Sequence, residues 1–372
     1  MEYQDLKRKI KTVTLTLTHQ CNLDCIYCYE CHKSDRSMTY ETAVAVIDRE
    51  TAQLDGWEGI EFDLFGGEPF LQFELIRKIT EYVCQKLQGF PHTVFLTTNG
   101  TLVHGEIAAW LKEHSDCVVC GLSLDGTRDM HNSNRSNSFD KIDLDFFAKT
   151  YPQQDIKMTV SQKTLPFLAE GVIFAHQKGF LVSCNLAYGI DWSDAENKAV
   201  LERELYKLID YYLAHPEIEP CSMLSMGITN VLLEERLPRR FCGAGIDMRA
   251  YDIDGEAYPC QFFMPLSVGA EKAKHAREIV FYKDSIPIEL IDESCKDCVI
   301  NACCPNCYGS NYAASGDIYK RDANLCTLIK IQICACAYFY AMQWSKGQLE
   351  KDDSEVRAIL QSVRIIQNML KI

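Results

Sequence analysis

The stretch Lys11–Cys28, KTVTLTLTHQCNLDCIYC, decides the fold. Its first eight residues alternate with period two and are rich in β-branched side chains, so they predict a strand over Lys11–Thr18. Cys21, Cys25 and Cys28 follow this strand at Cys-x3-Cys-x2-Cys spacing. A strand that runs directly into a loop of three thiols indicates a site built at its carboxyl end.

The composition restricts the class of protein. The chain has 372 residues, 19 cysteines and a formal net charge of −14, which disfavours a nucleic-acid partner. No apolar run approaches the roughly 20 residues of a membrane span, and the N-terminus lacks a signal-peptide core. We therefore expect a cytoplasmic protein with no membrane partner. In a reducing compartment, clustered cysteines are metal ligands or redox groups more often than disulfides.

Strand and helix patterns alternate from residue 11 to about 215. The predicted strands are 11–18, 60–65, 93–97, 118–124, 156–160 and 180–186, and the predicted helices are 39–54, 71–87, 105–113, 141–149, 166–178 and 194–214. Such alternation predicts an α/β fold with parallel strands. Six units fall short of the eight of a closed barrel. We expect an open partial (β/α)6 TIM-like barrel, although a doubly wound sheet fits the same count.

The pattern changes after residue 216, where cysteines, glycines and short turns replace the alternation. Metal is expected to hold such a segment together, because it has few core side chains. Two helices are predicted at the end, over 328–344 and 355–372. The predicted division is a barrel over 1–215, a connecting segment over 216–240, a small cysteine-rich domain over 241–330 and C-terminal helices over 331–372.

The spacing of the first three cysteines suits an iron–sulfur cluster with an open position. Three thiolates cannot saturate the four irons of a [4Fe–4S] cluster, so one iron is left for a ligand. In a barrel of parallel strands, the loop after strand one opens on the face that carries active sites. A zinc knuckle is the alternative, with Cys31 or His32 as the fourth ligand.

The motif Cys-x3-Cys-x-Tyr-Cys resembles the signature of the radical S-adenosylmethionine (SAM) superfamily. The resemblance implies an oxygen-sensitive oxidoreductase in which Cys21, Cys25 and Cys28 hold the catalytic cluster and the open iron binds SAM. Reductive cleavage of SAM would then give a 5′-deoxyadenosyl radical that abstracts hydrogen. The cofactor supplies this chemistry, while the protein binds and orients it.

Motifs after later strands extend the resemblance. Phe65-Gly66-Gly67-Glu68-Pro69 is similar to the family's motif for the SAM amino group, and Ser123 stands where the family's serine contacts the SAM ribose or carboxylate. The implied SAM contacts are Tyr27, Gly66, Gly67, Glu68, Asn99, Ser123, Asp125 and Ser161. His131 and Arg135 have a spacing common in peptide-modifying members, and a structural role for them is equally open.

The cysteines after residue 240 resemble the SPASM domain of radical SAM maturases, which holds two auxiliary [4Fe–4S] clusters. The resemblance assigns Cys242, Cys260 and Cys307 to the first, with either Cys221 or an open iron completing it. It assigns Cys295, Cys298, Cys304 and Cys326 to the second. The family's spacing fits Cys303 as well as Cys304, and we favour Cys304. The resemblance thus implies SAM and three [4Fe–4S] clusters.

The resemblance implies a substrate that is a peptide or protein. Three reactions compete, namely crosslinking of a ribosomally made precursor peptide, formylglycine formation in a sulfatase, and modification of a small molecule. Sulfatase-maturing relatives place a carboxylate base just after the cysteine at position 260, where this chain has Gln261, although Asp252, Asp254 or Glu256 could substitute. An open auxiliary iron would bind a substrate thiolate.

We therefore favour a thioether in a Cys-containing peptide. The expected partners are that peptide and an external electron donor, a flavodoxin or ferredoxin. Only twenty residues precede Cys21, so we expect any leader recognition to use a separate protein, the acidic surface or the core peptide itself.

Overall fold

The computed structural model of the chain describes residues 9–233, 240–283 and 286–369. These residues form two compact units, and each unit is assembled from separate stretches of sequence. Of the described residues, the first unit comprises 9–123, 135–154 and 243–281. The second comprises 124–134, 155–233, 240–242, 282–283 and 286–369.

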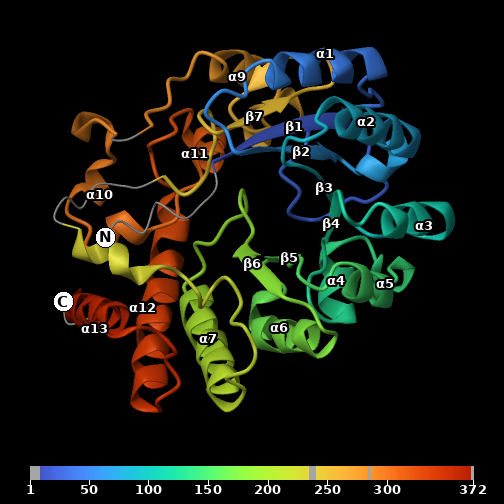
Figure 1. Cartoon of the computed structure of the whole chain (residues 1–372). Helices are drawn as coiled ribbons and strands as arrows, with labels where there is room; N and C mark the ends of the chain where they lie inside the picture. Colours follow the sequence, from blue (N-terminus) through green and yellow to red (C-terminus); the bar gives the residue numbers. More distant parts are fainter. Residues whose placement is uncertain (1–8, 234–239, 284–285, 370–372) are drawn as a thin grey trace. The chain divides into compact units, whose positions relative to one another are not determined.

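A six-stranded sheet forms the centre of the first unit (Figure 1). The strands β1 (Ile10–Thr18), β2 (Gly59–Gly66), β3 (His92–Thr98) and β4 (Val118–Leu122) are parallel and lie in the order β4-β3-β2-β1. In β1, Val13, Leu15 and Leu17 are fully buried, and so are the threonines that alternate with them. Burial on both faces is typical of a parallel sheet covered by helices.

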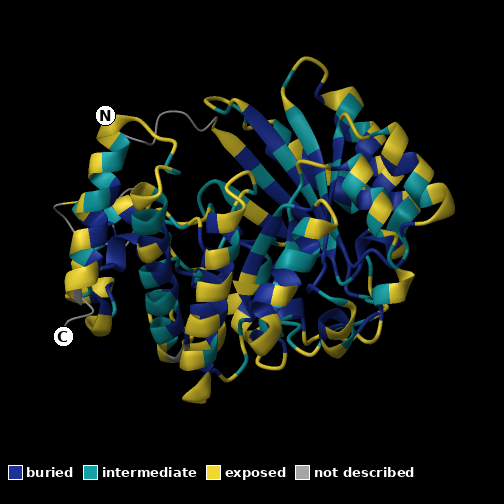
Figure 2. Cartoon of the chain, turned by 90° about the horizontal axis from the view of Figure 1, so that it is seen from below, coloured by how far each residue is buried: buried dark blue, intermediate teal, exposed yellow. Residues whose placement is uncertain are grey.

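Helices of the first unit follow the strands in the predicted order. They are α1 (Tyr40–Thr51), α2 (Phe73–Lys86), α3 (Gly105–Glu113) and α5 (Leu144–Thr150), with the short 3-10 turns η1 (Pro69–Gln72) and η2 (Phe139–Lys141). Thr39 caps α1, because its hydroxyl accepts a hydrogen bond from the Thr42 N–H. Figure 2 shows exposed residues on the outer faces of the helices and mostly buried residues along the strands.

Two short strands extend this sheet beyond β1 and were not predicted from the sequence. β7 (Met248–Tyr251) pairs in parallel with β1 from Thr12 to Leu15, and β8 (Ala257–Tyr258) pairs antiparallel to β7. They are followed by η5 (Gln261–Phe263), α8 (Pro265–Val268) and α9 (Ala270–Ala276). Part of the cysteine-rich segment therefore packs in the same unit as the first four strands.

The second unit contains the last two predicted strands. β5 (Ile156–Val160) and β6 (Val182–Leu186) pair in parallel, and α4 (Arg128–Asn134), η3 (Leu165–Phe167), α6 (Leu168–Gln177) and α7 (Glu196–Ala214) belong to the same unit. All six predicted parallel strands are present, which confirms the α/β class. They form two sheets, since the described strand ladders stop between β4 and β5.

Short elements and two long helices complete the second unit. They are η4 (Ile228–Leu232), η6 (Ile288–Leu290), α10 (Glu293–Lys296), η7 (Asn301–Cys303), α11 (Tyr308–Ser315), α12 (Ala323–Ser345) and α13 (Asp353–Met369). The predicted C-terminal helices correspond to α12 and α13. Helix α12 packs against both α7 and α13 (Figure 1).

Helix α12 corrects the expectation that no apolar run approaches a membrane span. Among the described residues, its segment Leu325–Ser345 is long and apolar enough to cross a membrane by length and composition alone. The helix also supplies fully buried core residues, namely Leu328, Ile333 and Phe339. A core helix of a soluble protein has this composition, and the packing of α12 on α7 and α13 fits that interpretation.

Candidate functional site

The first cysteine loop leaves β1 and keeps three thiols partly exposed. None of Cys21, Cys25 and Cys28 forms a disulfide, and the Cys28 N–H donates to the Cys25 carbonyl in a tight turn. Partial burial raises the pKa of the Cys21 and Cys28 thiols, and the charge of Lys33 opposes this shift. In the described ranges, no three His, Cys, Asp or Glu side chains converge on one ion position.

The glycine pair at the end of β2 lies against this cysteine loop. The Gly67 N–H donates to the Thr18 carbonyl at 3.0 Å, and the Glu68 N–H donates to the Gln20 carbonyl at 2.8 Å. A Cβ on Gly67 would overlap the Gln20 carbonyl oxygen, and one on Gly66 would lie 2.5 Å from the Thr18 oxygen. The glycines are therefore required for close contact between two backbone segments.

Glu68 is a fully buried carboxylate at the carboxyl end of β2. Its Oε1 accepts hydrogen bonds from the Thr98 hydroxyl at 2.7 Å and the Phe70 N–H at 3.2 Å, and its Oε2 accepts one from the Asn99 N–H at 2.9 Å. Burial raises the pKa of Glu68 to about 7, against these hydrogen bonds and the charge of Arg135. A bound ammonium group would favour the ionised form.

Asn99 connects the end of β3 to the cysteine loop. Its Nδ2 donates to Asn22 Oδ1 at 2.8 Å, and Asn22 in turn donates to the Thr101 hydroxyl at 2.8 Å. Ser123 is buried nearby in the sheet, where its N–H donates to the Thr98 carbonyl at 2.9 Å. These contacts bring the ends of β2, β3 and β4 to the three-cysteine loop.

The predicted contacts in the second unit are part of its internal hydrogen-bond network. Asp125 accepts from the Thr159 N–H on one carboxylate oxygen and from Asn134 Nδ2 on the other, both at 3.0 Å. The Ser161 hydroxyl donates to Asn134 Oδ1 at 2.7 Å, and His131 Nδ1 accepts from the Asp125 N–H. This network holds β5 and α4 together, and SAM binding by Asp125 and Ser161 stays a prediction.

Arg135 lies beside the cysteine loop. Its guanidinium stands over the Tyr27 ring, 5.4 Å from the centroid, and its Nη1 is 4.0 Å from Cys25 Sγ. Of the two candidates that the sequence left open, Arg135 thus contacts the site, whereas His131 contacts the backbone of Asp125.

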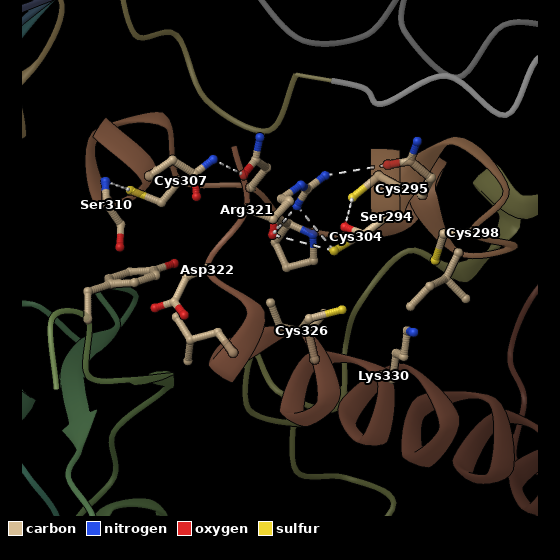
Figure 3. A pocket seen from close by; sticks show the side chains of 18 residues that line it. Ser294, Cys295, Cys298, Cys304, Cys307, Ser310, Arg321, Asp322, Cys326 and Lys330 are labelled. Atoms are coloured by element: carbon tan, nitrogen blue, oxygen red, sulfur yellow. Dashed lines mark hydrogen bonds between the residues drawn. The ribbon is translucent and has the colours of Figure 1, made fainter. Parts of the chain in front are cut away.

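Five of the later cysteines line one cavity of the second unit, shown in Figure 3. They are Cys295, Cys298, Cys304, Cys307 and Cys326. The empty volume of the cavity, with its open mouth included, is about 590 Å³. Arg321 Nη1 donates to Cys304 Sγ at 3.3 Å. The donor set, four or more thiols around an open space, fits an iron–sulfur cluster.

Cys303 and Cys304 have different surroundings. Cys304 lines the cavity, whereas Cys303 is buried outside the lining and its thiol donates to the Ile300 carbonyl at 3.4 Å. Burial raises the pKa of Cys303 to about 12. Cys304 is therefore the thiol of this pair that faces the other cysteines of the cavity.

The cysteines assigned to the first auxiliary cluster are divided between the units. Cys242 and Cys307 belong to the second unit and Cys260 to the first. Cys307 and Tyr188 line the same cavity, and burial raises the pKa of the Cys307 thiol to about 11. Cys221 is buried, its N–H donates to the Tyr212 phenol oxygen at 2.9 Å, and the adjacent Ser222 is hydrogen-bonded to the Cys184 backbone.

The acidic residues before Cys260 all have partners. His19 Nε2 pairs with Asp252 at 2.7 Å, Arg36 pairs with Asp254 at 2.6 Å, and Arg277 pairs with Glu256. Gln261 follows Cys260 in η5, and its buried Oε1 has no hydrogen-bond partner among the described residues. None of the three carboxylates is thus poised as an unpaired base.

Sequence reasoning missed Glu30, which lies two residues after the last cysteine of the loop. This carboxylate is buried, and its Oε1 has no hydrogen-bond partner among the described residues. Burial raises the pKa of Glu30 to about 8, with Lys33 acting against the shift and Glu68 adding to it. No sequence pattern marks it, because an acidic residue in a polar loop is ordinarily exposed.

The site geometry agrees with the comparison with known families. Residues 15–143 match the model of the radical SAM superfamily. The chain carries a radical SAM domain. The matched range includes the three cysteines of the loop, Glu68, Asn99 and Ser123. The protein is an enzyme of the radical SAM type, as the sequence predicted.

Relatives of this radical SAM enzyme include an uncharacterized protein and a sulfatase-maturating enzyme. An uncharacterized protein of Methanocaldococcus jannaschii is 33% identical over 169 residues, which is 44% of this chain and 57% of that protein. The cysteine-type anaerobic sulfatase-maturating enzyme of Clostridium perfringens is 24% identical over 273 residues, or 66% of this chain and 72% of the enzyme. The enzyme is thus related to maturases across most of its length.

Solved structures share the fold. Native anSMEcpe with bound AdoMet superposes with a TM-score of 0.68 at 18% identity, over 97% of this chain and 100% of that one. SuiB of Streptococcus suis, bound to the precursor peptide SuiA, gives a TM-score of 0.57 at 16% identity, over 84% of this chain and 75% of SuiB. Both support the partial-barrel architecture.

Proposed function

We propose that this radical SAM enzyme modifies a ribosomally made peptide and forms a thioether or another crosslink in it. The observation that carries the proposal is the loop of Cys21, Cys25 and Cys28, packed against Gly67 and Glu68. Three partly exposed thiols leave one iron of a [4Fe–4S] cluster for SAM. The peptide class is supported by the likeness to SuiB, which was solved with a precursor peptide.

The residues around the loop have distinct roles in this proposal. Cys21, Cys25 and Cys28 hold the catalytic cluster, and Glu68 accepts the SAM ammonium group. Tyr27, Gly66, Gly67, Asn99, Ser123, Asp125 and Ser161 are the further SAM contacts. Cluster and SAM together supply a 5′-deoxyadenosyl radical, and the chain orients the substrate hydrogen toward it. The buried ends of β2 and β3 keep water from Glu68.

Two auxiliary [4Fe–4S] clusters complete the proposed cofactor set. Cys295, Cys298, Cys304 and Cys326 hold one, which their common cavity supports. Cys242, Cys260 and Cys307 hold the other. Cys221 is buried beside Tyr212, and its neighbour Ser222 is hydrogen-bonded to Cys184, so we propose that this first auxiliary cluster would keep an open iron able to take a substrate thiolate. This arrangement favours a peptide cysteine as the site of modification.

Formylglycine formation on a sulfatase is the second candidate function, and the similarity to sulfatase-maturating enzymes supports it equally well at the level of family. The side chains near Cys260 favour crosslinking of a peptide over formylglycine formation. Gln261 cannot take a proton, and Asp252, Asp254 and Glu256 are each held by a basic side chain. Modification of a small molecule is a third, less supported outcome.

The proposed partners follow from the reaction. SAM cleavage needs an external electron donor, a flavodoxin or ferredoxin, and a separate leader-binding protein would deliver the precursor peptide. We propose that the enzyme works in the cytoplasm, where reducing conditions keep its thiols available to iron.

Anaerobic turnover of reconstituted enzyme tests the function. SAM, dithionite and a panel of Cys-containing peptides are added, and 5′-deoxyadenosine and peptide mass are followed. Peptide-dependent 5′-deoxyadenosine with loss of two hydrogens at a cysteine-containing site supports thioether formation. A product with formylglycine chemistry would favour the second candidate. No SAM cleavage by fully loaded enzyme, with the Cys25→Ala variant as the blank, would contradict the radical SAM reaction.

A further inference from the structure

Arg321 places a permanent positive charge on the cysteine cavity of the second unit. Its Nη1 lies 3.3 Å from Cys304 Sγ and 3.4 Å from the Pro305 carbonyl oxygen, and its Nη2 lies 3.5 Å from Asn301 Oδ1 (Figure 3). A guanidinium stays protonated at every pH at which the protein is folded. The charge at this sulfur is therefore constant.

The position of this guanidinium does not depend on the thiol alone. The Arg321 N–H donates to Asp292 Oδ2 at 3.0 Å, which anchors the backbone, and the Pro305 and Asn301 oxygens hold the side chain. Asp292 also caps α10, the helix that carries Cys295. Asp292 thus connects the segment just before Cys326 to the helix that carries Cys295.

The sulfur that Arg321 contacts is one of a group. Cys304 lines the cavity together with Cys295, Cys298 and Cys326. A guanidinium bonded to Cys304 Sγ would therefore stabilise negative charge on a cluster that these four thiols hold.

A cluster in this cavity would gain one negative charge on reduction. A cation bonded to a ligand sulfur favours the more negative state, and hydrogen bonds to sulfur together with net charge set cluster potentials. We propose that Arg321 raises the reduction potential of the cluster that Cys295, Cys298, Cys304 and Cys326 would hold. This inference rests on the proposed cluster assignment.

The test measures potentials instead of turnover. In the full-length Cys21→Ala/Cys25→Ala/Cys28→Ala background, only the two auxiliary clusters remain, and redox titration followed by electron paramagnetic resonance gives their potentials. Arg321→Gln should lower one potential by at least a tenfold change in the reduction equilibrium, which is about 59 mV for one electron. Arg321→Lys should retain most of the wild-type value.

Lys320→Met is the matched control, because it removes the same charge from the adjacent exposed residue. Its potentials should equal those of the background. Equal potentials in Arg321→Gln and the background, at equal iron content, overturn the inference and leave the proposed function intact. If Arg321→Gln fails to load iron, Arg321→Met takes its place, and a potential within about 59 mV of the background would then overturn the inference.

Failure of the cluster assignment gives a different result. Cys295→Ala/Cys298→Ala in the same background should lower iron by about four per chain. Unchanged iron in that variant would mean that the cavity holds no cluster, and it would overturn both the inference and the auxiliary-cluster part of the proposed function.

Discussion

Gly67 lies so close to Gln20 that no side chain fits between them. The Gln20 carbonyl oxygen accepts the Glu68 N–H at 2.8 Å, and a Cβ on Gly67 would overlap that oxygen and stand 3.0 Å from the Cβ of Cys21. The end of β2 therefore fixes the backbone that carries the first cysteine. A substitution at Gly67 should therefore disturb binding of the cluster more directly than binding of SAM.

Gly67→Ala should push the cysteine loop away from β2 and lower the iron content of reconstituted protein by about four per chain. The measurement is iron and sulfide analysis with the visible absorption spectrum. Gly227→Ala is the control, since its Cβ would meet no atom within 4 Å. Full iron loading in Gly67→Ala would show that the loop tolerates the displacement.

Glu68→Gln should weaken SAM binding about tenfold or more, because a bond to a charged acceptor contributes roughly 1.5–3 kcal/mol. The amide also places an N–H₂ group where Thr98 and Asn99 donate. Equilibrium binding of SAM to cluster-loaded enzyme measures the effect. Glu81→Gln, an exposed change on α2, should bind like wild type, and equal affinity in both variants would remove Glu68 from the SAM site.

Metal-free protein should lose stability as the pH rises from about 5 to 8. The pKa values of Glu30 and Glu68 in the folded chain, about 8 and about 7, lie above their ordinary value of 4.5. In this window the folded chain holds protons that the unfolded chain has released, so the free energy of unfolding falls with increasing pH.

Urea unfolding at several pH values measures this slope. Each pKa unit of difference corresponds to about 1.4 kcal/mol. Glu30→Gln should flatten the dependence between pH 5 and 8, whereas the exposed Glu41→Gln should leave it unchanged. An identical slope in Glu30→Gln and wild type would mean that the Glu30 carboxylate is not held protonated.

Cys304→Ser should remove about four irons per chain, whereas Cys303→Ser should retain them. Cys304 lines the cavity with Cys295, Cys298 and Cys326, and Cys303 lies outside the lining. Because Cys303 is buried, its variant should instead be less stable to denaturant. The reverse pattern of iron loss would assign the ligand role to Cys303.

Cys221→Ala should keep the full iron content of the wild-type enzyme. Cys221 is buried beside Tyr212, whose phenol oxygen accepts the Cys221 N–H at 2.9 Å, and the adjacent Ser222 is hydrogen-bonded to the Cys184 backbone. The effect of the change should be a loss of core packing, seen as a lower melting temperature. Loss of iron would make Cys221 the fourth ligand of the first auxiliary cluster and would remove the open iron.

The sequence predicted best those features that depend on the pattern of polar and apolar residues and on helix caps within a short stretch of chain. The six strands, the cap of α1 by Thr39 and the helix over 105–113 follow from period, caps and spacing, and the structure confirms them. The three-cysteine loop was found because its spacing has a chemical reason. These features depend on residues that are close in the sequence.

The remaining features depend on contacts between distant residues. β7 has four residues, too few for a periodic pattern, and its partner β1 lies more than two hundred positions earlier. Glu30 is unusual only through its burial, and Cys303 and Cys304 differ in burial and in which of them lines the cavity. None of these properties can be predicted from a short stretch of consecutive residues.

The pairing of β7 with β1 has a consequence for biosynthesis. The strand that leads into the cysteine loop acquires its second neighbour from residues 248–251, so the ribosome must extend the chain well past that point before the sheet is complete. Until then β1 is an open edge, which is prone to pair with other chains. A shortened chain that ends near residue 215 should therefore aggregate when it is expressed.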